Sequence, residues 1–385
     1  MIRFWDQTLR DGEQSPGVRF SPNEKLRLAG KMDEVGIAMA EVGFPVASKD
    51  DSRACKLLAD QQFRMRLICP ARCRVEDVDA VADTGVREIA LFISTSPELM
   101  RDSLRMNGNT VIDRINKMIE YSRDRGLYVH AVSEDTMRSR PDFILRFFKS
   151  AITAGAKGVV ITDTIGIATP AKVRKFAKLV RSSIRAQSYS IHVHDDLGLA
   201  TANTLAAVEA GFDVPQTTIN GIGERSGNAS FAEVCLALEL LYNWRTGVRM
   251  DRIYRLAHLV EKFSGVPIPA HKPVIGGNSF SHEAGVHVAA LLRNPRTYEP
   301  YPPEMVGRKR TFRIGKHTGR RLVENILGKS LDQESARTLT SRLKRLQERR
   351  SKREIYRLVR LLDRERSGIS EEELRRMFAK FPKKK

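Results

Sequence analysis

Residues 190–200 read Ser-Ile-His-Val-His-Asp-Asp-Leu-Gly-Leu-Ala, and the rest of the chain is interpreted around this stretch. Side chains two apart in a strand point to the same face, so a strand over Tyr189–His194 would present His192 and His194 together. An alanine-rich helical pattern follows at Thr201–Gly211. This order places two imidazoles at the carboxyl end of a strand, where catalytic groups collect in parallel α/β barrels. A pair of ordinary strand histidines is the alternative for an isolated His-x-His.

A second polar stretch, Asp-Gln-Thr-Leu-Arg-Asp-Gly-Glu-Gln at residues 6–14, follows a short apolar run at the start of the chain. If that run is the first strand, the polar residues would face the same rim as the histidines. Asp11, His192 and His194 would then form a site with mixed oxygen and nitrogen ligands. Such a site leaves positions open for water or substrate and suits Zn, Mn, Mg or Fe. Arg10, held beside the metal, could stabilise a developing oxyanion.

Apolar runs alternate with amphipathic ones over the first 245 residues, and this alternation predicts an α/β fold, a (β/α)8 TIM barrel. Prolines stand where two helices would begin, and glycines close several others. No glycine-rich dinucleotide fingerprint follows the first strand, which disfavours a Rossmann fold. The expected strands are Ile2–Trp5, Ala38–Val42, Arg66–Cys69, Glu88–Ile93, Tyr128–Val132, Gly158–Thr162, Ser190–His194 and Val214–Ile219. The expected helices are Pro22–Val35, Asp50–Gln61, Val75–Asp83, Val111–Arg125, Pro141–Ala154, Pro170–Arg185, Leu199–Ala210 and Phe231–Tyr242.

The alternation stops after Asn243, and the remaining sequence predicts two further regions. We expect the catalytic barrel at 1–245, a linker and active-site-completing subdomain at 246–320, and a mostly helical, basic C-terminal region at 321–385. Within these regions, Met250–Phe263 and Ser281–Arg293 have helical patterns, and helix resumes from Leu331 onwards.

Composition limits the class of protein. Hydrophobic residues make up 41% of the 385 residues, and no apolar run of about 18 residues indicates a membrane span. The four cysteines form no CxxC pair, so we expect reduced thiols in a cytoplasmic protein. The net charge is +20, and residues 329–385 carry 19 Lys and Arg against nine Asp and Glu. A basic tail can attract nucleic acid, but no binding motif accompanies it, so we expect a solvated helical tail.

Eight short motifs occur in one order over about the first 320 residues. Together they resemble the acyl-CoA-dependent, Claisen-condensing branch of the metal-dependent barrel enzymes, which comprises the homocitrate, 2-isopropylmalate and citramalate synthases. Each motif alone would be weak evidence. The motifs are Thr8–Gln14, Glu41–Pro45, Glu134–Thr136, Asp163–Gly166, His192–Gly198, Asn220–Asn228, Gly285–His287 and Gly315–Gly319.

The resemblance implies an acyltransferase. The methyl group of acetyl-CoA loses a proton, the resulting enolate attacks the ketone of a 2-oxo acid, and the thioester is hydrolysed. A divalent metal (Mg, Mn, Zn or Fe) polarises the ketone. The resemblance also implies a homodimer, because in relatives the histidine after the barrel reaches the partner subunit's site. The implied roles are metal binding for Asp11, His192, His194 and Asn228, catalysis for Arg10, Glu134 and His287, and substrate binding for Gln14, Glu41, His130 and Thr164.

The resemblance implies three possible acceptors, and two features of the sequence bear on the choice among them. The sequence shows no β-rich regulatory domain after Gly319, and this compact layout is typical of homocitrate synthases, which use 2-oxoglutarate. Lysine-pathway homocitrate synthases, however, usually place Arg at the position of His130 and His at that of Pro70. We therefore expect homocitrate synthase first, with 2-isopropylmalate synthase (2-oxoisovalerate) and citramalate synthase (pyruvate) as alternatives. Glu224 and Arg225 favour a synthase over a retro-aldol lyase on the same barrel.

Overall fold

The computed structural model describes residues 2–315, 317–327 and 333–348 of the 385-residue chain. Its internal contacts divide the chain into two compact units, Met1–Pro267 and Ile268–Lys385, and each unit is described by itself. In the described part of the chain, no helix is both long enough and apolar enough to cross a membrane.

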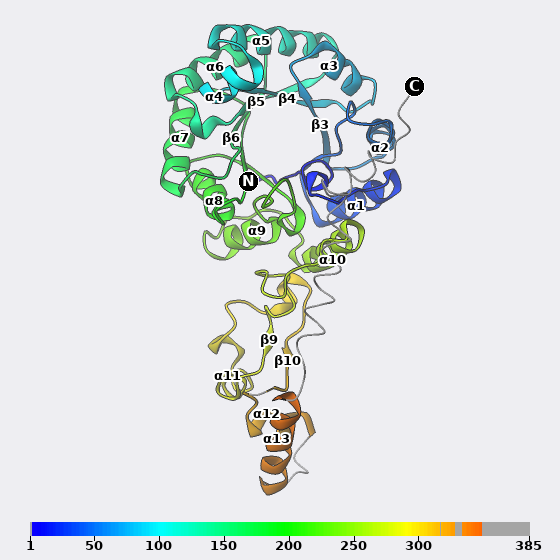
Figure 1. Cartoon of the computed structure of the whole chain (residues 1–385), viewed down its shortest axis with the longest axis vertical. Helices are drawn as coiled ribbons and strands as arrows, with labels where there is room; N and C mark the ends of the chain where they lie inside the picture. Colours follow the sequence, from blue (N-terminus) through cyan, green and yellow to red (C-terminus); the bar gives the residue numbers. More distant parts are fainter. Residues whose placement is uncertain (1, 316, 328–332, 349–385) are drawn as a thin grey trace, which may run out of the picture. The chain divides into compact units, whose positions relative to one another are not determined.

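The first unit is a closed barrel of eight parallel strands in sequence order, with the first strand also paired to the last (Figure 1). The helices form an outer ring around the strands. The predicted TIM barrel is therefore confirmed, as is each expected strand, to within a few residues. The strands are β1 (Trp5–Asp6), β2 (Met39–Glu41), β3 (Arg66–Arg72), β4 (Glu88–Ser94), β5 (Tyr128–Glu134), β6 (Gly158–Asp163), β7 (Ser188–Val193) and β8 (Val214–Thr217).

The barrel helices begin and end at signals visible in the sequence. Ser21 and Glu24 form a capping box at the start of the first helix, Pro22 occupies its first turn, and Gly36 closes it with a φ of 94°. The helices of this unit are α1 (Pro22–Val35), α2 (Lys49–Ala59), α3 (Val75–Ala82), α4 (Pro97–Leu99), α5 (Gly108–Asp124), α6 (Pro141–Ala154), α7 (Pro170–Ser183), α8 (Ala200–Glu209), α9 (Phe231–Leu240) and α10 (Ile253–Ser264).

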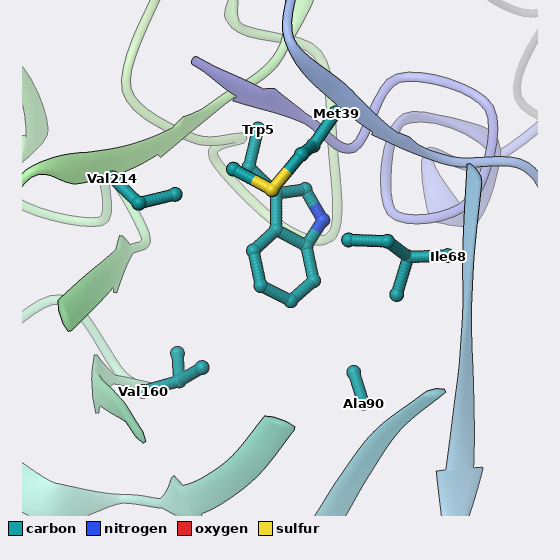
Figure 2. Close-up of a cluster of buried hydrophobic side chains, with 6 residues drawn as sticks. All are labelled: Trp5, Met39, Ile68, Ala90, Val160 and Val214. Atoms are coloured by element: carbon teal, nitrogen blue, oxygen red, sulfur yellow. The ribbon is translucent and has the colours of Figure 1, made fainter. Parts of the chain in front are cut away.

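The interior of the barrel is filled by apolar side chains from six of its strands. Figure 2 shows the indole of Trp5 lying centrally among the other members of this cluster, all of which are at most 2% exposed. Burial of a large apolar side chain contributes roughly 1.5–3 kcal/mol to folding. The cluster closes the barrel, so that a ligand cavity can open only towards its ends. Its members are Trp5, Met39, Ile68, Ala90, Val160 and Val214.

Strand β3 extends three residues beyond the predicted end at Cys69 and contains Pro70. A proline has no N–H and is usually excluded from the middle of a sheet. Here β2 stops pairing with β3 at Ile68, whereas β3 continues to pair with β4 through Arg72. Pro70 is therefore tolerated because β3 has only one strand neighbour at that level.

The first unit ends later than the sequence suggested. Helix α10 packs against α1, so the structural division falls after Pro267, whereas we expected the barrel region to end at residue 245. A helix that follows the eighth βα repeat has no strand of its own, and nothing local in the sequence indicates which unit covers its apolar face.

Among the described residues, the second unit has a two-stranded parallel sheet and three α-helices. Ser281 and His282 pair with Thr311 and Phe312, so the predicted helix over Ser281–Arg293 is wrong in its first residues and right in its second half. The predicted helix from Leu331 is described only to Glu348, and its remainder lies outside the described residues. The elements are β9 (Ser281–His282), α11 (Gly285–Leu291), β10 (Thr311–Phe312), α12 (Arg320–Leu327) and α13 (Gln333–Glu348).

Candidate active site

A cavity of about 230 Å³ opens at the carboxyl ends of the barrel strands. Strand residues that line it lie two apart, such as His192 and His194, or Val132 and Glu134, because alternate side chains of each strand point into the barrel. The lining residues are Gln7, Arg10, Asp11, Gln14, Glu41, Phe44, Pro70, Ala90, Phe92, Val132, Glu134, Thr162, Thr164, His192, His194, Gln216 and Glu224.

Three side chains converge in this cavity as potential metal ligands. One ligand atom from each of Asp11, His192 and His194 lies within 4.8 Å of the other two. The Nε2 atoms of the two histidines are 3.2 Å apart, and His192 Nε2 lies 3.9 Å from Asp11 Oδ2. The structure thus brings together three of the four residues that were predicted to bind a metal, from β7 and the loops after β1 and β7.

The two imidazoles are in the unprotonated form that metal binding requires. Burial lowers the pKa of His192 to about 3 and also lowers the pKa of His194, so both rings are neutral at physiological pH. His194 Nδ1 lies 3.3 Å from the carbonyl oxygen of Gly227. If Nδ1–H donates there, the Nε2 lone pair of His194 is left free to bind a metal. Neutral rings with converging Nε2 atoms fit a divalent cation, which needs unprotonated ligands.

Asp11 is held by the loop after β8. Its Oδ1 accepts hydrogen bonds from Asn228 Nδ2 at 2.8 Å and from the Glu224 backbone N–H at 3.3 Å. Burial raises the pKa of Asp11, but the charge of Arg10, the two histidines and the hydrogen bond from Asn228 together outweigh burial, and the net pKa is below its usual range. A Cβ on Gly223 would lie 2.7 Å from Asp11 Oδ1 and 2.1 Å from Asn228 Nδ2, so this close approach requires glycine.

Asn228 also provides an observation that favours a bound cation. Its Oδ1 is buried and has no hydrogen-bond partner among the described residues. A buried carbonyl oxygen without a donor costs free energy, and a nearby cation would offset that cost. The donor set of one carboxylate, two imidazoles and one amide oxygen therefore fits Zn, Mn, Mg or Fe.

Arg10 connects the metal-ligand set to the β2 side of the cavity. Its guanidinium donates to Asp11 Oδ2 at 2.7 Å and to Glu41 Oε2 at 2.5 Å. Glu41 Oε1 accepts a further bond from Gln7 Nε2 at 2.9 Å, so both oxygens of this buried carboxylate are occupied. Glu41 therefore acts in this structure as the residue that orients Arg10, while Gln14 lies exposed at the cavity rim.

Glu134 and Thr164 lie on the β5–β6 side of the cavity. Glu134 ends β5, and burial raises the pKa of its carboxyl group. Thr164 Oγ1 accepts a hydrogen bond from the Asp135 backbone N–H at 2.9 Å and lies 3.1 Å from Thr162 Oγ1. The structure thus places the predicted acid–base residue and the predicted carboxylate-binding threonine in the same cavity as the candidate metal ligands.

His130 does not line this cavity. It lies two residues deeper in β5 than Val132, is 1% exposed, and its Nε2 is 2.9 Å from Glu88 Oε2. Its ring packs on Trp5 with a centroid distance of 4.8 Å. The expectation that His130 contacts substrate is therefore not supported. Residue spacing predicts which face of a strand a side chain occupies, but it does not predict how deep in the barrel that side chain lies.

His287 belongs to the second unit, in α11. It is exposed, and its ring stacks on Tyr298 with centroids 4.1 Å apart and planes 32° apart. Val286 beside it is 77% exposed. An exposed histidine next to an exposed valine is a suitable surface for a contact outside its own unit.

Sequence reasoning missed the apolar side of the cavity. Five side chains from β3, β4, β5 and the loop after β2 form what we call the apolar wall. The rings of Phe44 and Phe92 lie 6.4 Å apart within it. An inward apolar residue in a strand looks like a core residue, so no local signal distinguishes a cavity wall from packed interior. The apolar wall consists of Phe44, Pro70, Ala90, Phe92 and Val132.

Comparisons with known proteins agree with this geometry. Residues 1–260 match the HMGL-like family model, and residues 274–351 match the homocitrate synthase post-HMGL domain-like family model. The barrel resembles the solved HMG-CoA lyase of Bacillus subtilis with a TM-score of 0.64 and 19% identity, over 70% of this chain and 96% of the lyase, a likeness of fold alone.

Curated relatives cover most of the chain. Homocitrate synthase AksA of Methanopyrus kandleri is 42% identical over 91% of this chain and 88% of its own length. The 2-isopropylmalate synthase of Sulfurisphaera tokodaii is 39% identical over 90% of this chain and 91% of its own length. The (R)-citramalate synthase CimA of Methanocaldococcus jannaschii is 38% identical over 89% of this chain and 70% of its own length.

The fold and the site define a barrel enzyme with a candidate metal centre at the carboxyl ends of its strands. The chain belongs to the HMGL-like family, in its branch of homocitrate, citramalate and 2-isopropylmalate synthases. The resemblance seen in the sequence motifs is confirmed, and so is the class of enzyme, an acyltransferase that condenses an acyl-CoA with a 2-oxo acid. The three relatives differ by only a few per cent in identity, so identity does not select the acceptor.

Proposed function

We propose that this protein condenses acetyl-CoA with a 2-oxo acid whose side chain is small and apolar, in a metal-dependent reaction. The observation that carries the proposal is the division of one cavity between the metal-ligand set with Arg10 and the apolar wall. A divalent ion held by Asp11, His192 and His194, with Asn228 beside it, would polarise the ketone of the acceptor.

Glu134 is the best candidate for taking the methyl proton from acetyl-CoA. Three carboxylates besides it line the cavity. Asp11 belongs to the metal-ligand set, both oxygens of Glu41 are occupied, and Glu224 is exposed at the rim. Glu134 is half-buried and accepts one side-chain hydrogen bond, which leaves an oxygen for proton transfer.

Arg10 and Thr164 are proposed to bind the oxygens of the acceptor. The Arg10 guanidinium lies beside Asp11, so it is placed to stabilise negative charge on the ketone oxygen as the new carbon–carbon bond forms. Thr164 directly follows β6, and its hydroxyl would donate a hydrogen bond to the carboxylate of the acceptor. Water then cleaves the thioester and coenzyme A leaves as a free thiol.

The apolar wall supports 2-oxoisovalerate or pyruvate as the acceptor, in place of 2-oxoglutarate, which the sequence favoured. Among the described residues that line the cavity, Arg10 is the one arginine or lysine, and it is already paired with two carboxylates. A distal carboxylate against Phe92, Pro70 and Val132 would be desolvated without a cationic partner, which is costly. The 42% identity to a homocitrate synthase is the observation that keeps 2-oxoglutarate as the second candidate.

One assay tests both the condensing activity and the choice of acceptor. The protein is supplied with a divalent metal and acetyl-CoA, and thiol release is measured with 2-oxoisovalerate, pyruvate and 2-oxoglutarate in parallel. We expect kcat/KM for one of the two apolar acceptors to exceed that for 2-oxoglutarate by at least about tenfold. A preference for 2-oxoglutarate would overturn the choice of acceptor, and no release with any acceptor would overturn the condensing activity. Cleavage of a hydroxyacyl-CoA without consumption of acetyl-CoA would indicate a lyase.

We further propose that the protein acts as a homodimer in which His287 serves the partner subunit's cavity. Its exposure and its stacking on Tyr298 support a role outside its own unit. Mixing two inactive variants, His192→Ala and His287→Ala, should regain part of the activity, because mixed dimers contain one complete site. Subunits must be exchanged by mild dilution before assay. Recovery no greater than the sum of the two separate activities would contradict shared sites.

A further inference from the structure

Ser94 is the last residue of β4 and lies directly beside the end of β5. In the parallel ladder, Ser94 is the register partner of Glu134. Its side chain is buried, with 3% exposure, and its hydroxyl donates a hydrogen bond to Glu134 Oε2. No hydrogen bond to Glu134 Oε1 is found in the described part of the chain, so the carboxylate has one tethered oxygen and one that remains available.

We infer that Ser94 is a positioning residue for proton transfer: its hydroxyl fixes the Glu134 carboxylate so that Oε1 is the atom offered to substrate. The inference rests on the proposed role of Glu134 as the proton acceptor. A carboxylate on a flexible side chain is otherwise free to rotate about its last bond, and a fixed geometry is what general base catalysis requires.

The backbone of Glu134 is held by a different set of groups. Its carbonyl oxygen accepts from the Thr95 N–H at 2.9 Å and from Thr95 Oγ1 at 3.0 Å. Thr95 Oγ1 in turn lies 2.7 Å from Ser133 Oγ and 2.8 Å from Ser139 Oγ. Removing the Ser94 hydroxyl should therefore free the carboxylate and leave the turn that carries it in place.

The same hydrogen bond acts on the proton affinity of Glu134. Burial raises the pKa of Glu134, the Ser94 hydroxyl lowers it by stabilising the ionised form, and the neighbouring charge of Asp135 raises it. Asp135 is itself paired with Arg138. Without Ser94, the two raising effects would act unopposed. The other titratable side chains that line the cavity are Arg10, Asp11, Glu41, His192, His194 and Glu224.

The test compares Ser94→Ala with the wild-type protein in the thiol-release assay across pH. We expect kcat to fall about tenfold near neutral pH, because a hydrogen bond to a charged group is lost, while KM for the 2-oxo acid changes less than about twofold. The limb of the pH profile that depends on Glu134 should move up by about one pH unit. Ser94→Thr, which keeps the hydroxyl, should restore both. An unchanged profile in Ser94→Ala would overturn the inference.

Two further variants separate positioning from packing. In a Glu134→Gln background, Ser94→Ala should cause no additional loss of kcat, whereas an additive loss would indicate a merely structural effect. Ser139→Ala is the matched control, because it also removes a buried hydroxyl that bonds Thr95 and the Asp135 carbonyl oxygen without touching the carboxylate. Its pH profile should keep the wild-type limb even where stability falls.

A direct titration distinguishes failure of the Ser94 inference from failure of the proposed function. With ¹³C-labelled glutamate carboxyl groups, the Glu134 signal is assigned by its absence in Glu134→Gln, and its pKa is measured in the wild-type protein and in Ser94→Ala. We expect the pKa to rise by about one unit in the variant. An equal pKa would refute the contact even if the enzyme is active. Absence of thiol release by the wild-type protein would refute the proposed function and leave this titration decisive for Ser94.

Discussion

The two sides of the catalytic cavity differ in chemistry and in how each is built. On one side, Asp11, His192 and His194 converge within 4.8 Å, and Asp11 is paired with Arg10. On the other side, the apolar wall offers only carbon side-chain surface from β3, β4, β5 and the loop after β2. The proposed condensation would use both, because the polar side would activate the oxygens that all 2-oxo acids share and the apolar wall would contact the part in which they differ.

Relatives that are similarly close to this chain carry three different names, those of homocitrate, citramalate and 2-isopropylmalate synthases. In the proposed reaction, the polar side would serve the chemistry that these three activities share, and the apolar wall would determine the acceptor. The predictions below test whether the two sides are separable in this way, beginning with the largest expected effect.

Removing one metal ligand should eliminate the function of the polar side altogether. His192→Ala is expected to lose bound divalent metal and to reduce thiol release to background, because two ligands rarely retain a metal that three were built to hold. Metal content after dialysis and the turnover rate measure the two effects. His130→Asn serves as the control for loss of a buried barrel histidine, since His130 lies outside the cavity and its variant should still bind metal. Near-normal turnover in His192→Ala would contradict the ligand role.

Much of the polar side was predictable because its signals are local. Two histidines two apart in a strand must share a face, and an aspartate just after the first strand must lie at the same end of a parallel barrel. The depth of a residue along the barrel axis has no such signal. His130 and Val132 share the inward face of β5, yet only Val132 reaches the cavity.

The apolar wall was not predictable from the sequence for a related reason. Phe92 and Val132 alternate with outward residues in the same way as the core residues Ile68 and Val160. Whether an inward apolar side chain packs against another or faces a cavity depends on every neighbouring strand at once. The short sheet formed by β9 and β10 was missed because each strand has only two residues, too few to show a period-two pattern.

Changing the apolar wall should alter selection of the acceptor while preserving the metal site. Phe92→Ala removes an aromatic ring from the wall, so kcat/KM for 2-oxoisovalerate should fall about 10- to 100-fold, and the ratio of 2-oxoisocaproate to 2-oxoisovalerate should rise. Metal content should remain that of the wild-type protein. Phe143→Ala, which removes a half-buried aromatic ring from α6 on the outer ring of helices, is the matched control. An equal loss with every acceptor would mean that Phe92 supports the whole cavity.

The smallest expected effect is on the free energy of unfolding of the metal-free protein, which the buried histidines of the polar side make dependent on pH. Burial holds the pKa of His192 at about 3, whereas an unfolded chain binds that proton near pH 6.5. Between these values the unfolded state carries more protons than the folded state. The free energy of unfolding therefore decreases as pH falls from about 6.5 towards 3, and one such histidine accounts for about 1 kcal/mol between pH 7.5 and 5.5. The apolar wall contributes nothing to this dependence.

The measurement is urea unfolding of the metal-depleted protein at pH 7.5 and 5.5, for the wild-type chain and for His192→Gln. The wild-type protein should lose about 1 kcal/mol more than the variant over this interval, because glutamine takes no proton in either state. His130 is also buried with a lowered pKa, but it is present in both proteins and its contribution cancels. Equal losses in the two proteins would mean that the folded chain protonates His192 easily, and the polar side would then not be held ready for a metal ion.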